Sequence, residues 1–340
     1  MRSKDYIHPL LTICIASVLL VFGGCSSNGN VKYSRFAGKA LGTYYSITVA
    51  SSMADSVVQQ TIDSTFSAVN YLFSIYDSST VISHFNRAKE YVVNAEFAAL
   101  LSLSQRMSEL TQGAYDPTVG ALARLWGFGA DQFKAVDTAA LAAARTYTGY
   151  KHIRVSGDTV FKDDPRVELT LNAMAKGYAS DRIAAALQQC GCTAAMVEVG
   201  GEIATYGSSP RGDAWRLGID APEKGNMPGE KLITTFTLDS GGIATSGNYR
   251  EFQESNGKEW GHTINPTTGM PERNNLLSAT VVAGTCAVAD ALATAMMVLG
   301  PEKSMALVEE TDGIECVLLC LDNGELKQWA SAGIKGTENQ

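Results

Sequence analysis

Asp290 and Thr294 stand four residues apart within the largely apolar segment 286–299. This spacing places both side chains on one face of a helix. A carboxylate buried in such a helix needs a partner, because an isolated buried charge is costly. Mg²⁺ is one candidate, since it commonly binds one or two protein oxygens and fills its other positions with waters or substrate phosphates. Hydrogen bonds from neighbouring backbone groups are the alternative.

A second candidate site lies in segment 171–181 (LNAMAKGYASD), where a predicted strand runs into a helix whose first turns carry Lys176. The free N–H groups and positive dipole end of a helix N-terminus suit a phosphate. Lys176 would add a positive charge at the same place. The alternative is a solvated lysine beside an ordinary helix start.

Two further segments combine turn residues with chemically useful groups. Segment 113–120 (GAYDPTVG) surrounds Asp116 with glycines and an aromatic ring, which suits a loop approached by a flat ligand. The alternative is a plain turn between helices. His262 precedes the Asn265-Pro266 turn and is placed to be an exposed acid–base group. An isolated structural histidine is the competing interpretation.

Several classes of site are absent from the sequence. It contains no GxxxxGK[ST], no GxGxxG after a strand, no HExxH and no GxSxG, so the corresponding nucleotide-binding, zinc-protease and hydrolase motifs are missing. The net charge is −8 with no basic block, which argues against a nucleic-acid partner. No CxxC pair supports a zinc ribbon or thioredoxin-type site. A Cys190–Cys192 or other disulfide stays open.

The N-terminus predicts export and a lipid anchor. Arg2 and Lys4 precede an uncharged apolar run at 9–22, which is shorter than the roughly 20 residues that span a membrane and has the length of a signal-peptide core. Gly23, Gly24 and Cys25 follow and resemble a bacterial lipobox. We therefore expect a signal peptide at 1–24, a lipidated Cys25 with a flexible tether at 25–34, and one domain at 35–335. A plain secretory signal is the alternative.

The elements that must position these groups follow from periodicity. We expect helices over 53–73, 95–112, 138–147, 174–189, 286–299 and 302–310. We expect strands over 43–49, 167–171, 194–199, 203–206, 215–219, 231–238 and 278–283. Hairpins are predicted at 152–161 and at 315–329, the latter turning at Asn323-Gly324. The mixture lacks strict βαβ alternation and predicts an α+β fold, a single compact unit of mixed, mostly antiparallel sheets with packed helices.

Five separated motifs together resemble the family of ApbE-like FAD:protein FMN transferases, from Gly38 to about Trp329. They are GKALGTYYSI, LFSIYDSSTVISHFN, GAYDPTVGALARLWGFG, NAMAKGYASD with VEVGGEI, and ATSGNYREF…GHTINPTTG…ADALATAMMVLG. The resemblance implies a T-fold-related architecture. It also implies a magnesium-dependent transfer of FMN from FAD, as substrate, onto a threonine or serine of an acceptor flavoprotein, with release of AMP.

The resemblance also implies site residues. Family contacts to FAD fall on Leu41, Tyr76, Ala114, Tyr115, Asp116, Thr170, Lys176 and Ile264. Family contacts to the metal fall on Asp290, Thr294 and the backbone carbonyl region of Ala173. The chain departs from the family at Ala293, where some relatives carry a second acid, and at Asn265, where an aspartate is common.

Roles for two further residues are hypotheses. His262 is the candidate general base for the acceptor hydroxyl, and Arg250 a candidate contact to the phosphate or the transition state. The competing functions are an FAD pyrophosphatase that yields FMN and AMP, a flavin-binding lipoprotein without turnover, and a glycan-directed lipoprotein. The expected partners are redox flavoprotein subunits of membrane electron-transfer complexes, which would place the chain on the periplasmic face of the inner membrane.

Overall fold

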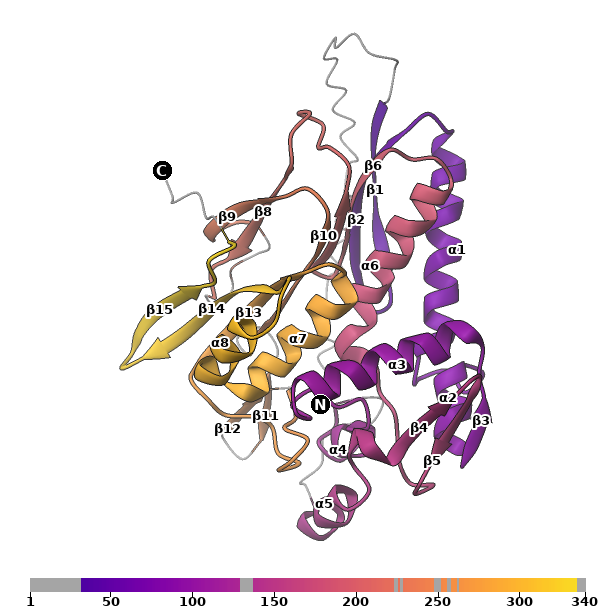
Figure 1. Cartoon of the computed structure of the whole chain (residues 1–340), viewed down its shortest axis with the longest axis vertical. Coiled ribbons are helices and arrows are strands. Elements are labelled where there is room, and N and C mark those ends of the chain that lie inside the picture. The colour runs from indigo at the N-terminus through magenta and orange to yellow at the C-terminus, as the bar shows by residue number, and fades with distance from the viewer. Residues whose placement is uncertain are drawn as a thin grey trace, which may run out of the picture. The chain divides into compact units, whose positions relative to one another are not determined.

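The computed structural model describes residues 32–128, 137–222, 226, 229–247, 252–255, 258–261 and 263–334, and its backbone is built around one eight-stranded sheet (Figure 1). The strands follow the order β1-β2-β6-β7-β10-β13-β14-β15, and every neighbouring pair is antiparallel. Their bounds are β1 Lys32–Ala40, β2 Thr43–Ser51, β6 Ala194–Val199, β7 Glu202–Tyr206, β10 Gly241–Gly247, β13 Leu276–Ala283, β14 Glu315–Asp322 and β15 Glu325–Ala330.

Two tight hairpins close the edges of this sheet. Leu41 and Gly42 join β1 to β2 with φ of 51° and 76°, and Asn323 and Gly324 join β14 to β15 with φ of 51° and 84°. Two successive residues with positive φ match the type I′ turn, whose twist suits adjacent strands. The Asn323-Gly324 turn is confirmed. The β1–β2 turn was not expected. Strand β1 begins at Lys32, within the segment 25–34 that was predicted to be a flexible tether.

Helices cover one face of the sheet. They are α1 (Asp55–Phe73), α3 (Ala95–Leu110), α6 (Asn172–Gln189), α7 (Cys286–Leu299) and α8 (Pro301–Glu309). Helix α6 lies between α1 and α7, with α6 over β6 and β7 and α7 over β10 and β13 (Figure 1). Fully buried Ile47, Ile183, Val197 and Leu292 belong to the shared apolar core.

A small hairpin covers part of the opposite face. Strands β8 (Trp215–Asp220) and β9 (Leu232–Leu238) pair with each other. Leu217 and Phe236 from this hairpin cluster with Ile243 of β10, whereas the next residue, Ala244, belongs to the helix-side core. Successive strand residues point to opposite faces, so the hairpin packs on the face away from the helices.

The remaining elements are short. A three-stranded sheet has the order β3-β5-β4, with β3 at Glu90–Val92, β4 at Ile153–Ser156 and β5 at Thr159–Lys162. The other elements are α2 (Val81–Arg87), α4 (Gly120–Leu125), α5 (Thr138–Arg145), the 3₁₀ turn Tyr150–His152, and the pair β11 (Phe252–Ser255) and β12 (Lys258–Gly261).

The fold class is confirmed: the described residues between Lys32 and Ile334 form one compact unit of helices and antiparallel sheet. The strand predicted at 167–171 is wrong, because only Glu168 makes a bridge there, to Val119. None of the described helices is long and apolar enough to cross a membrane. The described cysteines, Cys190, Cys192, Cys286, Cys316 and Cys320, are free, so no Cys190–Cys192 disulfide is formed.

Helices α6 and α7 pack unusually closely at Gly177. A Cβ atom at Gly177 would lie 2.3 Å from the carbonyl oxygen of Cys286 and 2.9 Å from Cβ of Asp290. Distances below 3.0 Å to backbone atoms cannot be relieved by a side-chain rotation. Glycine at 177 therefore sets the separation of the two helices.

We predict that Gly177→Ala destabilises the fold by about 1–3 kcal/mol through overpacking. The matched control is Gly284→Ala, because a Cβ at Gly284 has no neighbouring atom within 4 Å. Thermal and denaturant unfolding of both variants measure the difference. Equal stability of the two variants would contradict the close helix contact.

Candidate active site

Asp290 lies at the contact between α6 and α7. Its Oδ2 accepts a hydrogen bond from the backbone N–H of Gly177 at 3.0 Å, and the residue is 2% exposed. Burial raises the pKa of Asp290, while the positive charge of Lys176 opposes that shift. The close helix packing thus brings the acid of segment 286–299 to the lysine-bearing turn of α6, where a backbone N–H is one of its partners.

Lys176 completes a buried charged cluster with Glu202 and Asp290. Its Nζ lies 3.0 Å from Oε1 of Glu202, and its side chain keeps 34% of its surface exposed. Burial acts to lower the pKa of Lys176, but the carboxylates of Asp290 and Glu202 outweigh burial and hold the pKa above its usual value. Lys176 is therefore charged, fixed by Glu202 and still reachable from solvent.

The cluster fits a further cation. The ammonium of Lys176 pairs with Glu202 and acts on the charge of Asp290, and Oε2 of the buried Glu202 has no hydrogen-bond partner in the described part of the chain. Thr294, one turn after Asp290, has its Oγ1 3.3 Å from Oγ of Ser246. Carboxylate and hydroxyl oxygens are ligands that Mg²⁺ accepts, with few protein groups needed. Within the described ranges no three His, Cys, Asp or Glu side chains are grouped to hold a metal.

The N-terminus of α6 is open to a ligand. Leu171 is its N-cap residue and makes no side-chain capping bond. The N–H of Met174 donates to the carbonyl of Leu171 at 3.0 Å, which leaves the N–H groups of Asn172 and Ala173 as first-turn donors without an intrahelical acceptor. This end of the helix therefore suits an anion. Ala173 and Lys176 lie in the first two turns. The predicted metal-contact residue and the predicted phosphate-contact residue are therefore neighbours on one helix.

Segment 113–120 packs against the same helix start. The hydroxyl of Tyr115 lies 2.9 Å from that of Ser104 and donates to Sδ of Met174 at 3.2 Å. Asp116 accepts from the N–H of Thr118 and of Tyr150, each at 2.8 Å. Burial raises the pKa of Asp116, and these hydrogen bonds oppose the shift. The Asp116 side chain thus binds backbone groups of its own loop and of the 3₁₀ turn at Tyr150. The group that segment 113–120 offers to a ligand is therefore its backbone.

Thr170 joins the two motifs. Its N–H donates to the carbonyl of Pro117 at 2.8 Å, two residues before α6 begins. Segment 113–120 is consequently joined to the start of α6 by this backbone bond and by the side-chain contact of Tyr115 with Met174.

Ile264 belongs to a loop, residues 263–272, that lies on α4 and α5. The Ile264 side chain is buried in an apolar cluster with Leu122, Trp126 and Leu141. The indole N–H of Trp126 donates to the carbonyl of Gly269 at 2.8 Å. The side chain of Ile264 is therefore a packing group, and its backbone is what the loop can present.

The β1–β2 turn also reaches the cluster. A Cβ at Gly200 would lie 3.0 Å from Cδ of Lys176 and 3.0 Å from Cγ2 of Thr43, so the turn that carries Leu41 ends near the lysine stem. Tyr76 is 65% exposed, and no contact in the described structure joins it to the cluster. Cys25, Arg250 and His262 lie outside the described residues.

Two site residues were missed from the sequence. Glu202 belongs to the VEVGGEI motif, and the signal for it is an acid at the start of a buried strand. Asp181 accepts from the N–H groups of Cys286 at 2.9 Å and Ala287 at 2.8 Å. Its carboxylate ties α6 to the first turn of α7, and burial raises its pKa to about 6.

Relatives of known sequence are similar to this chain over nearly its whole length. The chain is 35% identical to an FAD:protein FMN transferase of Vibrio cholerae over 331 residues, covering 95% of this chain and 97% of the relative. It is 31% identical to an FAD:protein FMN transferase of Haemophilus influenzae, covering 99% of both.

Solved structures agree as well. The flavin transferase ApbE from Vibrio cholerae superposes with a TM-score of 0.81 at 32% identity, covering 90% of this chain and 99% of that one. The apo flavinyl transferase ApbE of Pseudomonas stutzeri gives a TM-score of 0.80 at 29% identity, covering 89% and 95%. The model of the ApbE family matches residues 41–318, and this protein therefore belongs to the ApbE family.

Proposed function

We propose that this chain is an FAD:protein FMN transferase that moves FMN from FAD onto a threonine or serine hydroxyl of an acceptor flavoprotein and releases AMP in a magnesium-dependent reaction. The observation that carries the proposal is the buried charged cluster beside the open N-terminus of α6. A pyrophosphate is the part of FAD that needs a helix N-terminus, a lysine and a cation together. The names of the similar proteins supply the substrate class.

The described residues bind and orient the pyrophosphate. The ion pair with Glu202 fixes the orientation of the Lys176 ammonium before FAD binds. Binding of the phosphate therefore costs little additional side-chain entropy. The first-turn N–H groups of α6 offer further donors. Asp290, Thr294 and the carbonyl of Ala173 would hold Mg²⁺, which when bound neutralises charge on the phosphates and the leaving group.

The acceptor hydroxyl attacks the FMN-side phosphorus while the bond from that phosphorus to the bridging oxygen breaks, and AMP leaves with that oxygen. The hydroxyl proton must be taken up, and His262 is the proposed base because its ordinary pKa lies near neutrality. Arg250 is the proposed contact to the transferring phosphate. Both roles rest on sequence position.

We further propose that Cys25 carries a lipid and that the enzyme works on the periplasmic face of the inner membrane, where redox flavoprotein subunits of electron-transfer complexes would be its acceptors. A tether that confines enzyme and acceptor to one surface raises their effective concentration.

The transferase proposal predicts covalent flavinylation in vitro. Incubation of the chain with FAD, Mg²⁺ and a candidate acceptor should add the mass of an FMN group to one threonine or serine, with an equal amount of AMP. Intact-mass and peptide mass spectrometry measure this. AMP release in the presence of a competent acceptor without a mass gain would instead indicate a pyrophosphatase, and FAD binding without AMP would indicate a flavin-binding protein.

Asp290→Asn and His262→Ala should each lower the rate of transfer by about a hundredfold or more, because one removes a metal ligand and the other the proton acceptor. FAD binding should stay within about tenfold, since the α6 N-terminus and Lys176 remain. Stopped assays and flavin fluorescence titrations measure the two effects. Asp312→Asn, at an exposed turn, is the control, and full activity of either variant would remove that residue from the mechanism.

Cys25→Ser should move the protein from the membrane fraction to the soluble periplasmic fraction, because stable anchoring depends on acyl chains. Fractionation after osmotic shock, with detergent extraction as the reference, measures the change. Unaltered membrane retention of the variant would contradict lipid anchoring.

A further inference from the structure

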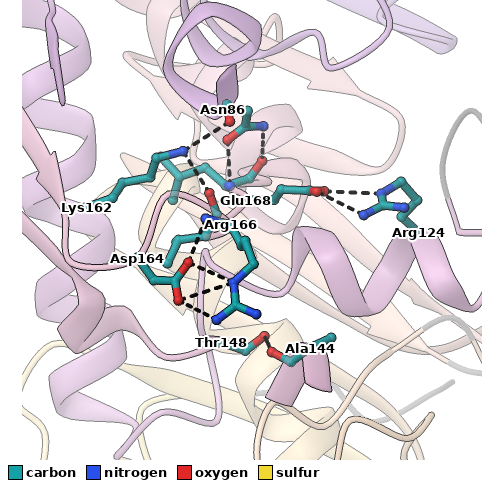
Figure 2. Close-up of polar contacts among 10 residues, drawn as sticks. Asn86, Arg124, Ala144, Thr148, Lys162, Asp164, Arg166 and Glu168 are labelled. Carbon is teal, nitrogen blue, oxygen red and sulfur yellow. Dashed lines mark hydrogen bonds and ion pairs between the residues drawn. The ribbon is translucent and has the colours of Figure 1, made fainter. Parts of the chain in front are cut away.

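Segment 167–170 leads into α6, and segment 117–120 beside it satisfies backbone groups of Glu168 and Thr170 but not the carbonyl of Val167 or the backbone of Leu169. Side chains do so instead (Figure 2). The amide of Asn86 binds Leu169 twice: its Nδ2 donates to the Leu169 carbonyl at 2.9 Å, and its Oδ1 accepts from the Leu169 N–H at 2.7 Å. Nζ of Lys162 donates to the carbonyl of Val167 at 3.0 Å.

The same lysine joins the two anchor points. Nζ of Lys162 also donates to the backbone carbonyl of Asn86 at 3.0 Å, and it lies 5.0 Å from the centre of the Phe85 ring. Lys162 is 2% exposed, and burial lowers its pKa to about 8. A buried amine is costly unless its hydrogen bonds are made, and both of these acceptors are backbone carbonyls. Asn86 and Lys162 therefore form one unit, the Asn86–Lys162 clamp.

The clamp binds the backbone of Val167 and Leu169, directly before the candidate site. The next residue after Leu169 is Thr170, whose N–H reaches Pro117 of segment 113–120. The carbonyl of Glu168, between the two clamped residues, accepts from the N–H of Gly120 at 3.2 Å. Helix α6 begins at Asn172 and carries Lys176 one turn later. A shift of the clamped backbone would move both motifs relative to each other.

We propose that Asn86 and Lys162 are positioning residues for the flavin site: by holding residues 167–169 they set the place of Thr170 and of the first turn of α6. The inference rests on the proposed function of that site. Neither side chain is required to touch FAD. Asn86 comes from α2 and Lys162 from β5, so the small three-stranded sheet and its helix act as the support of the site.

The test compares Lys162→Met, which keeps most of the side-chain length but has no donor, with Asn86→Ala and with Arg166→Ala as control. Arg166 lies in the same loop, but its side chain pairs with the exposed side of Asp164 and not with the clamped backbone (Figure 2). Each clamp variant should raise KM for FAD by about tenfold or more, with kcat at saturating FAD changed less than about threefold. The Arg166 variant should keep the wild-type KM. Clamp variants with the KM of the control would overturn the proposal.

Amide hydrogen exchange of the wild-type chain is a second test of the clamp. It does not require that the variants fold. The N–H of Leu169 should be protected as strongly as the core amides of α6. Exchange of Leu169 at the rate of the exposed turn 156–158 would overturn the clamp, whatever the variants do. If the wild-type chain neither bound nor consumed FAD, the proposed function would fail, and the exchange measurement would still decide whether the clamp holds the backbone.

Discussion

The burial of the Asp290 carboxylate between two helices is the constraint on which the site depends. A charge in this position is tolerated only with nearby donors and an opposite charge. Gly177 supplies the donor, and only a glycine lets α7 come near enough for the bond at 3.0 Å. Lys176, the preceding residue, supplies the charge. One dipeptide on α6 therefore permits close packing and also compensates the acid that the packing buries.

Asn and Asp side chains stabilise the irregular segments around this point. Each accepts hydrogen bonds from backbone N–H groups that no helix or strand satisfies, and the group consists of Asn86, Asp116, Asp181 and Asn265. Unpaired buried backbone groups are costly, so a site made from loops needs such substitutes for a strand ladder. This explains why short polar residues are frequent in the motifs.

The sequence predicts well the elements that obey local rules. The helix predicted from residue 95 follows Asn94, a residue typical of N-caps, and Oδ1 of Asn94 accepts from the N–H of Phe97 at 2.8 Å. Strand β10 was missed because its glycines disfavour a strand, yet a Cβ at Gly242 would lie 2.1 Å from the Cys286 nitrogen. The glycine is there for a helix distant in sequence, and local propensity cannot register that.

Segment 167–171 also shows what local sequence patterns cannot predict. Val167, Leu169 and Leu171 are all buried, so the alternation correctly marked one buried face. It could not show that Asn86, more than eighty residues earlier, satisfies the backbone in place of a neighbouring strand. The resemblance placed Thr170 at the site, but the reason for its position became visible only in three dimensions.

Asn265 illustrates how a departure from a family pattern is accommodated by a neighbour. Its Oδ1 accepts from the N–H groups of Thr267 and Thr268 at 2.9 and 3.1 Å, a task that an aspartate would perform equally. Its Nδ2, however, donates to Oε2 of Glu272 at 2.6 Å. An aspartate there would set two carboxylates against each other, and like charges at such a distance destabilise the ionised pair. The amide at 265 and the acid at 272 are therefore matched, and together they keep the loop that presents Ile264 closed on itself.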